Sequence, residues 1–184
     1  DLHSFPTRRS SDLTEVTKED LKNAVEDEFG VKYSKDWKRL LEANIGSDGV
    51  YSIRKGVKVI AKNAFLYCLC LDNINIPNSV ISIGSNAFKG CWSLKSINIP
   101  ESVTCIEDYA FAYCNSLKSI NMSESVTTIG KGAFCNCNSL KSINIPESVT
   151  SIGYSAFYNC NFLKSINIPE SVTCIEDHAF AYCI

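Results

Sequence analysis

The sequence predicts an α/β repeat solenoid, because two residue patterns recur along it at one fixed interval. An Ala-Phe pair appears six times at a constant step, with its aromatic residue at Phe65, Phe88, Phe111, Phe134, Phe157 and Phe180. A cysteine follows each Phe by three positions, at Cys68, Cys91, Cys114, Cys137, Cys160 and Cys183. An interval of about 20 to 50 residues is typical of stacked coils, since one coil cannot bury its own apolar residues. We therefore expect six 23-residue coils with a shared core.

Each coil is expected to begin with a short strand. Ile97 and Ile99 alternate with polar residues, which is the pattern of a strand with one buried face. Pro100 then ends the strand, because proline has no N–H to donate. Val103 and Ile106 follow on a second extended piece. The Ala-Phe-x-x-Cys segment predicts a tight helical or 3₁₀ turn that leads into the next coil.

These residues resemble the BspA-type leucine-rich repeat, whose pattern is close to I-x-I-P-x-S-V-x-x-I-G-x-x-A-F-x-x-C-x-x-L. The resemblance covers residues 48–184 and includes six copies in register. It implies a right-handed coil with a parallel β-sheet along one face. Many members belong to bacterial surface or host-facing proteins that act in adhesion, so the resemblance also implies a binding role. Departures are local: Met122 and Ser123 replace Ile-Pro, and Glu107 and Glu176 replace a usual Gly.

Composition agrees with one extended domain and excludes two classes of protein. The chain has 184 residues, 45% hydrophobic residues and a net charge of −2. This is neither the composition of a disordered chain nor the charge of a general nucleic-acid binder. No run approaches the roughly 18 apolar residues of a membrane-spanning helix, so we expect no transmembrane segment.

Three regions are predicted along the chain. Residues 1–13 match the translation of a short-read sequencing adapter, so we exclude them from the fold and expect the natural start of the gene, with any signal peptide or anchor, to lie elsewhere. Residues 14–47 are predicted to form a helical N-terminal cap. Residues 48–184 are predicted to form the leucine-rich repeat solenoid, truncated in mid-coil at the C-terminus. We expect a truncated array to self-associate end to end or to fray, because Val172 and Ile175 would lack a covering coil.

The cap is predicted from a change to a helical period. Thr17 and Asp20 resemble a capping box, and the apolar stripe that follows ends at Gly30. Ser34 is predicted to cap a second helix, whose apolar face would consist of Trp37, Leu40, Leu41 and Ile45. Such a helix pair is most simply the cover of the first coil. A separate partner-binding helix pair is the alternative.

The cysteines are the first candidates for chemistry, and we interpret them as structural. Ten cysteines in 184 residues are fewer than a disulfide scaffold would have. Stacked coils would hold successive members of the six-cysteine column about 4.8 Å apart with parallel side chains, beyond the usual Cβ separation of a disulfide. We therefore expect buried, reduced thiols. The pairs Cys68/Cys70 and Cys135/Cys137 have no histidine beside them, so we expect no zinc site.

The sequence offers little to an enzyme. His178 is the only histidine after residue 13, and we expect it on the surface. The sequence contains no phosphate-binding glycine loop, no nucleophile elbow and no metal-ligand spacing. We predict that these residues have no enzymatic activity and bind no cofactor.

The exposed side of the strands is the candidate binding face. If Ile97 and Ile99 point inward, their neighbours point outward and form columns along successive coils. The outward columns consist of asparagines (Asn75, Asn98, Asn121, Asn144, Asn167), serines (Ser96, Ser119, Ser142, Ser165) and lysines along one margin (Lys95, Lys118, Lys141, Lys164). Along the opposite margin, about 20 Å away, runs a glutamate column (Glu101, Glu124, Glu147, Glu170).

Three functions remain open for this chain. The first is a non-enzymatic binding or adhesion module of a bacterial protein, extracellular or at the cell surface, which recognises a protein or glycan through the strand face. The second is a spacer that holds another domain. The third is an intracellular interaction module, which the unpaired thiols favour. Duplication alone also copies surface columns, and large aromatic residues are absent from this face, so we expect modest affinity per site and avidity from several coils.

Overall fold

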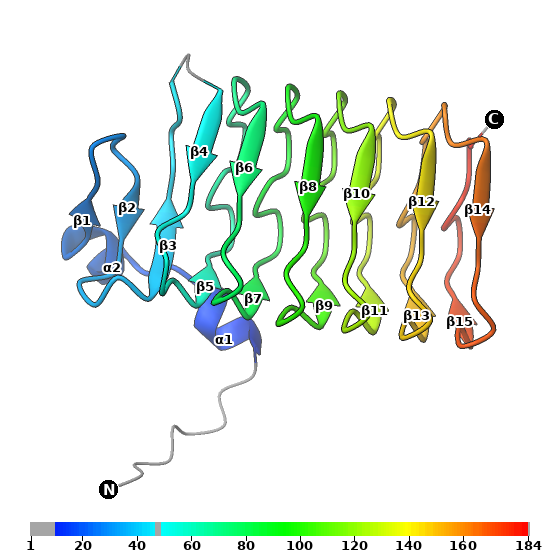
Figure 1. Cartoon of the computed structure of the whole chain (residues 1–184), viewed down its shortest axis with the longest axis horizontal. Coiled ribbons are helices and arrows are strands. Elements are labelled where there is room, and N and C mark those ends of the chain that lie inside the picture. Colours follow the sequence, from blue (N-terminus) through cyan, green and yellow to red (C-terminus); the bar gives the residue numbers. More distant parts are fainter. Residues whose placement is uncertain (1–9, 47–48, 184) are drawn as a thin grey trace, which may run out of the picture.

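The computed structural model describes residues 10–46 and 49–183. The chain winds through successive coils that stack side by side into one elongated solenoid (Figure 1). Each coil adds one strand to each of two rows that run along the length of the molecule. The predicted solenoid of six coils with an N-terminal cap is confirmed.

The first row contains the strands that the Ile-x-Ile pattern predicts. Its members are β4 (Val50–Ser52), β6 (Asn73–Asn75), β8 (Ser96–Asn98), β10 (Ser119–Asn121), β12 (Ser142–Asn144) and β14 (Ser165–Asn167). They form three parallel pairs, β4–β6, β8–β10 and β12–β14. Equivalent residues of paired coils lie side by side, as Ile97 and Ile120 do. The repeat period therefore sets the register of the pairing.

The second row lies on the other side of the core. Its members are β5 (Val59–Ile60), β7 (Ser82–Ile83), β9 (Cys105–Ile106), β11 (Thr128–Ile129), β13 (Ser151–Ile152) and β15 (Cys174–Ile175). Strands β9, β11, β13 and β15 form a parallel sheet, while β5 and β7 continue a sheet that begins in the cap. Both rows bury apolar side chains between them.

A column of stacked phenylalanine rings runs through the core. Phe65, Phe88, Phe111, Phe134 and Phe157 are fully buried. Neighbouring ring centroids lie 4.9 to 5.5 Å apart, and the rings are inclined by at most 15°. The stack ends at Phe180, which is half-buried. Since each ring covers the next, burial of the column depends on the stacking of coils.

The six-cysteine column lies beside the Phe stack and closes the turns. From Cys91 onward, each thiol of the column donates a hydrogen bond to the backbone carbonyl of the Phe in the preceding coil, as Cys91 does to Phe65 and Cys137 to Phe111, at 3.2 Å. Five of the six cysteines in the column are buried, and Cys183 is half-buried. All ten cysteines of the chain are free. Each thiol thus acts as a small apolar side chain that also pairs a buried carbonyl.

Each Ala-Phe turn has two residues in the left-handed backbone region. One precedes the Ala and the other follows the Phe by two positions. These residues are Asn63, Asn86, Tyr109, Gly132, Ser155 and His178 in the first column, and Tyr67, Gly90, Tyr113, Asn136, Asn159 and Tyr182 in the second. A Phe N–H then donates to the Ala carbonyl of the next coil, as Phe88 does to Ala110 at 2.8 Å.

The cap begins with two short helices, α1 (Ser10–Thr14) and α2 (Lys18–Lys22). The predicted capping box is confirmed, because the side chains and backbones of Thr17 and Asp20 bond reciprocally. Arg39 forms an ion pair with Asp20 at 2.9 Å and thereby joins α2 to the sheet. Each helix has five residues, and no helix within 10–46 or 49–183 could cross a bilayer. Of the segment 1–13 that was predicted to derive from an adapter, residues 1–9 lie outside the described residues and residues 10–13 belong to α1.

The second predicted helix of the cap is wrong, and the first predicted helix ends at Lys22 instead of reaching Gly30. The chain instead forms β1 (Val25–Glu26), β2 (Lys32–Tyr33) and β3 (Arg39–Glu42), and Gly30 lies in the turn between β1 and β2 with φ 75°. Strand β3 runs parallel to β5, with Leu40 beside Ile60. The first coil has an open strand edge, and pairing this edge outweighs the helical pattern of the cap. A strand also buries adjacent leucines on its two faces, so Leu40 and Leu41 are both buried.

A buried polar cluster fixes the β1–β2 hairpin to the first coil. The hydroxyl of Tyr51 donates to the Asp27 carboxylate at 2.5 Å and also bonds to the hydroxyl of Tyr33. The other oxygen of Asp27 accepts from the N–H groups of Phe29 and Val31. Tyr51 is a buried residue of β4 in the first coil. Burial, together with the Asp27 carboxylate, raises the pKa of Tyr51 and keeps its hydroxyl protonated as a donor.

Candidate functional site

The candidate site is the strand face, which we define as the exposed serine, asparagine and lysine columns along the first row of strands. Every predicted member is exposed: Asn75, Asn98, Asn121, Asn144, Asn167, Ser96, Ser119, Ser142, Ser165, Lys95, Lys118, Lys141 and Lys164. Paired strands bring like residues together, Ser96 beside Ser119 and Asn98 beside Asn121. Polar groups are therefore repeated along the face at the spacing of β-strands, about 4.8 Å.

The central isoleucine of each strand lies between the polar columns. Ile97, Ile120 and Ile143 are only 4%, 8% and 6% exposed. Ile99 and Ile145 are 2% exposed and belong to the core. The alternation fixes which side chains reach solvent, since a slip of one residue would expose the isoleucines and bury the asparagines.

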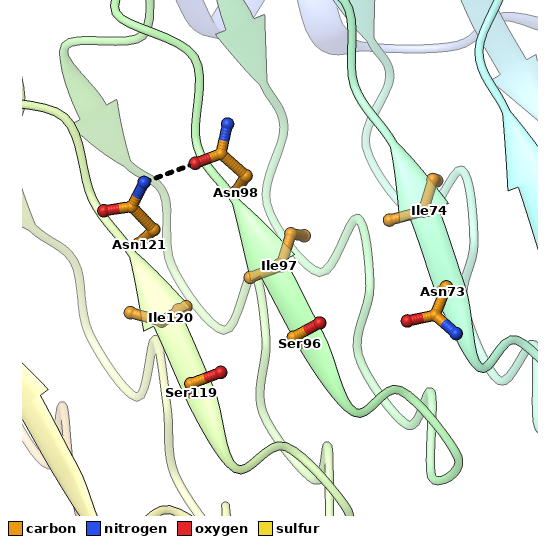
Figure 2. Close-up of a pocket in the computed structure, with 8 residues that line it drawn as sticks. All are labelled: Asn73, Ile74, Ser96, Ile97, Asn98, Ser119, Ile120 and Asn121. Atoms are coloured by element: carbon orange, nitrogen blue, oxygen red, sulfur yellow. Dashed lines mark hydrogen bonds between the residues drawn. The ribbon is translucent and has the colours of Figure 1, made fainter.

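A shallow depression of about 340 Å³ crosses the strand face at β6, β8 and β10. Figure 2 shows Asn98 and Asn121 at one end of their strands, Ser96 and Ser119 at the other, and the isoleucines between them. The complete lining is Asn73, Ile74, Ser96, Ile97, Asn98, Ser119, Ile120 and Asn121. The depression combines a narrow apolar floor with amide and hydroxyl groups on both sides, which suits a ligand that hydrogen-bonds along an extended backbone.

Two asparagines of this depression bond to each other. The amide nitrogen of Asn121 donates to the side-chain oxygen of Asn98 at 2.6 Å (Figure 2). The bond uses one donor and one acceptor of the pair, so the amide N–H groups of Asn98 and the oxygen of Asn121 are left to face solvent. This pair of asparagines therefore holds its side chains in order and still offers both donors and acceptors.

The lysine margin changes along the solenoid. Asp72 occupies the lysine position of an early coil, and it forms an ion pair with Lys95 at 2.6 Å. Among the residues that the structure describes, Lys118, Lys141 and Lys164 form no ion pair. The margin is therefore neutralised beside β6 and β8 and becomes positively charged from β10 onward.

Two contributions to the depression were missing from the sequence prediction. Asn73 holds the serine position of its coil, one full repeat before Ser96, so the repeat itself could have identified it. No sequence signal indicated that isoleucines form the floor of the depression, because the repeat pattern marks Ile74, Ile97 and Ile120 only as inward residues. Their edges reach the surface between the strands.

The buried members of the six-cysteine column are unreactive in the folded chain. Burial raises the pKa of the Cys114 and Cys160 thiols to about 12, and that of Cys137 well above its ordinary value. These thiols remain protonated at neutral pH, where only the thiolate is a nucleophile or metal ligand. Within 10–46 and 49–183, no group of three or more His, Cys, Asp or Glu residues could hold a metal ion.

Comparison with solved structures finds bacterial leucine-rich repeat proteins. A leucine-rich cell surface protein from Faecalibacterium prausnitzii is 33% identical with a TM-score of 0.70, and the match covers 84% of this chain and 39% of that one. A leucine-rich repeat protein from Eubacterium ventriosum is 26% identical with a TM-score of 0.68, over 88% of this chain and 50% of that one. The pneumococcal vaccine antigen PcpA shares the fold at 24% identity and a TM-score of 0.68, over 85% and 44%. The chain spans half or less of the length of these three proteins.

Family comparison gives a match over most of the chain. The model of the BspA type Leucine rich repeat region matches six copies across residues 58–184. A comparison with curated proteins found no significant match. The matched region contains the six Ala-Phe turns and the six-cysteine column described above. The chain therefore belongs to the BspA-type leucine-rich repeat family.

Proposed function

We propose that this chain is a non-enzymatic binding module of a bacterial surface or secreted protein, which recognises a protein or glycan through the strand face. The observation that supports this most directly is the exposed, in-register set of serine, asparagine and lysine columns. Family membership supports a binding scaffold. The surface location is supported by the similarity to a protein described as a leucine-rich cell surface protein.

The repetition of the strand face favours a partner that is itself repetitive or extended. The polar groups recur about every 4.8 Å along the solenoid, so a linear polymer or an extended peptide meets the same set of donors and acceptors at each coil. Aromatic anchors, which dominate many interfaces, are absent from the serine and asparagine columns. Each coil then contributes little, and the total affinity comes from several coils acting together.

An intracellular interaction module is the second candidate, and the cysteines favour it. All ten are free, and Cys70 and Cys174 are exposed. Exposed thiols are prone to oxidation outside the cell, whereas cytosolic thiols are kept reduced. A spacer that holds a separate domain is the third candidate, since the chain covers only part of the structures that it resembles.

Array binding with matched variants tests the proposed face. Glycan and linear-peptide arrays would be probed with the wild type, with an Asn98→Ala, Asn121→Ala, Asn144→Ala variant, and with a Thr104→Ala, Thr127→Ala, Thr150→Ala control. The three threonines are exposed at the start of the second row, where Thr127 and Thr150 bond to the carbonyl of the preceding coil. Ligands should be lost by the asparagine variant and kept by the control. Equal binding by both variants, or no ligand for the wild type, would contradict the proposal.

We also propose that the 184-residue chain self-associates end to end. Ile168 and Ile175 in the last coil are 38% and 48% exposed, whereas their counterparts Ile145 and Ile152 are 2% and 0% exposed. We expect sedimentation velocity to show concentration-dependent association, which Ile168→Lys with Ile175→Lys should suppress. A wild-type monomer at all concentrations would count against end-to-end contact.

A further inference from the structure

The exposed side of the Ala-Phe turns has a chain of alternating lysine and aromatic side chains. We call it the turn edge and define it as Lys89, Tyr109, Tyr113, Lys131, Tyr154 and His178. The ammonium of Lys89 lies 5.4 Å from the Tyr109 ring centroid and 6.0 Å from that of Tyr113. The ammonium of Lys131 lies 5.9 Å from the Tyr109 centroid and 5.3 Å from that of Tyr154. The Tyr154 ring meets His178 edge to face at 5.6 Å.

The backbone holds this chain in place. Tyr109 and Tyr113 have left-handed φ values of 55° and 61°, in turns whose N–H groups donate to the next coil. Gly132 leaves room for the Tyr109 ring, because a Cβ at this glycine would lie 2.3 Å from the tyrosine Cε1. The positions of the rings are therefore set by the fold before any partner arrives, which lowers the entropy that binding costs.

The two lysines of the turn edge retain their charge. None of the four ion pairs found among the described residues includes Lys89 or Lys131. Two nearby carboxylates bind backbone groups instead: Asp108 accepts from the Lys131 N–H at 2.8 Å, and Glu176 accepts from the Tyr154 N–H at 2.9 Å. Contact with the tyrosine faces steadies the ammonium groups without neutralising them. The two ammonium groups thus remain outside any ion pair of the described residues, while the Asp108 and Glu176 carboxylates keep their negative charge at the same turns.

The turn edge has a single register, unlike the strand face. The position after each Phe is occupied in turn by Leu66, Lys89, Ala112, Cys135, Tyr158 and Ala181. Lys89 therefore occurs once, and Tyr109 contacts both lysines in one place only. A partner that binds here cannot shift by one coil and find the same contacts.

We propose that the turn edge is a second interaction surface, which binds an acidic segment of a protein partner in one fixed register. Tyrosine is a preferred residue of protein interfaces, and the two ammonium groups supply the complement to Asp and Glu side chains. Stacked sugars fit less well, because lysine ammonium groups already lie over the ring faces that a sugar would cover. This surface is separate from the strand face and does not depend on the function proposed for it.

Lysine-resolved NMR with a defined peptide tests the surface. The probe is a synthetic dodecapeptide of Glu and Asp with one central Phe, compared with its Gln and Asn counterpart and with a sulfated hexasaccharide. Reductive ¹³C-methylation labels each lysine and keeps its charge, and the single variants Lys89→Gln and Lys131→Gln assign the two signals. We expect the acidic peptide to shift the signals of Lys89 and Lys131 before those of other lysines, with binding that weakens as salt is raised.

The matched variants measure how much the two lysines contribute. Lys89→Gln with Lys131→Gln should weaken peptide binding by about tenfold or more. The control, Lys55→Gln with Lys58→Gln, removes the same charge from exposed residues of the first coil and should leave binding within about twofold. Equal loss in both variants, equal binding of the neutral peptide, or signals at Lys89 and Lys131 that respond to the hexasaccharide alone would overturn the proposal.

Discussion

The strand face presents the same residues coil after coil, whereas the turn edge presents different residues in almost every coil. Along the strand face, Lys, Ser and Asn recur unchanged from β8 to β14. Along the turn edge, Lys89 and Tyr109 have no identical counterparts in the adjacent coils. Both surfaces rest on one interior of stacked Phe rings and cysteine thiols. Divergence of the repeats is therefore compatible with the fold wherever a side chain reaches solvent, and it has occurred mainly on one side.

The two surfaces suit different kinds of partner for this reason. A periodic surface offers several equivalent sites, so a linear ligand can bind in many registers and gains affinity through avidity. An irregular surface offers one set of contacts and selects one register. The following tests begin with the interior that both surfaces share and end with the differences between them.

Removal of one interior ring should have the largest effect on stability. Phe134 is fully buried and stacks on Phe111 and Phe157 at 5.5 and 5.3 Å. Phe134→Ala should lower the free energy of unfolding by about 3 to 5 kcal/mol. Asn144→Ala on the strand face should change it by less than about 0.5 kcal/mol. Denaturant unfolding measures both, and similar losses would mean that the inner and outer faces are assigned wrongly.

A change at the turn edge should have an intermediate effect. Gly132→Ala places a Cβ at φ 56° and 2.3 Å from the Tyr109 ring, so we expect a loss of about 1 to 3 kcal/mol. Gly46→Ala is the matched control, because nothing lies within 4 Å of the added Cβ and its φ is not in the left-handed region. Thermal or denaturant unfolding should separate the two variants. A neutral Gly132→Ala would show that the Tyr109 ring is free to move away.

Most of the architecture could be predicted from the sequence, because the repeat forces equivalent residues together. The Phe and Cys positions define the coil, and Ile97 with Ile99 defines the buried side of the strand. The turn edge was not predicted, because its contacts follow no single period. Lys131 and Tyr154 occupy equivalent positions of successive coils. Lys89 instead meets Tyr109, which precedes Ala112, the residue equivalent to Lys89 in the next coil. Such contacts depend on how left-handed turns project their side chains.

The cap shows a second reason why a local sequence pattern can predict the wrong structure. Leu40 and Leu41 fit a helical stripe in sequence, but the neighbouring coil offers an unpaired strand edge at β5. Pairing with that edge satisfies backbone groups that a helix would leave exposed on the coil. Only knowledge of the adjacent coil could reveal this. The same holds for the bond between Tyr51 and Asp27, which joins residues from separate elements.

The smallest effect on stability should come from the ionisation of the buried thiols. It should depend on pH and not on the surface variants. Burial raises the pKa of Cys114 and Cys160 to about 12. The folded state therefore keeps the thiol protons that the unfolded state releases above about pH 8.5. Their contribution to stability is present below the unfolded pKa and is lost as pH rises through the folded pKa. Iodoacetamide at mildly alkaline pH should label exposed Cys70 and Cys174, and mass spectrometry should find the buried column unmodified. Labelling of Cys114 in the folded chain would contradict its burial.

Deletion of one coil tests the contrast between the two surfaces most directly. Removing residues 116–138 deletes one full repeat and joins Asn115 to Ser139, which preserves the period. The deletion keeps the interior columns and the strand face, but it removes Lys131 from the turn edge. Circular dichroism should show a folded solenoid, and titration of the acidic dodecapeptide should show binding weakened by about tenfold or more. Unchanged peptide affinity in a folded deletion variant would contradict a turn edge with one fixed register, and loss of folding would contradict interchangeable coils.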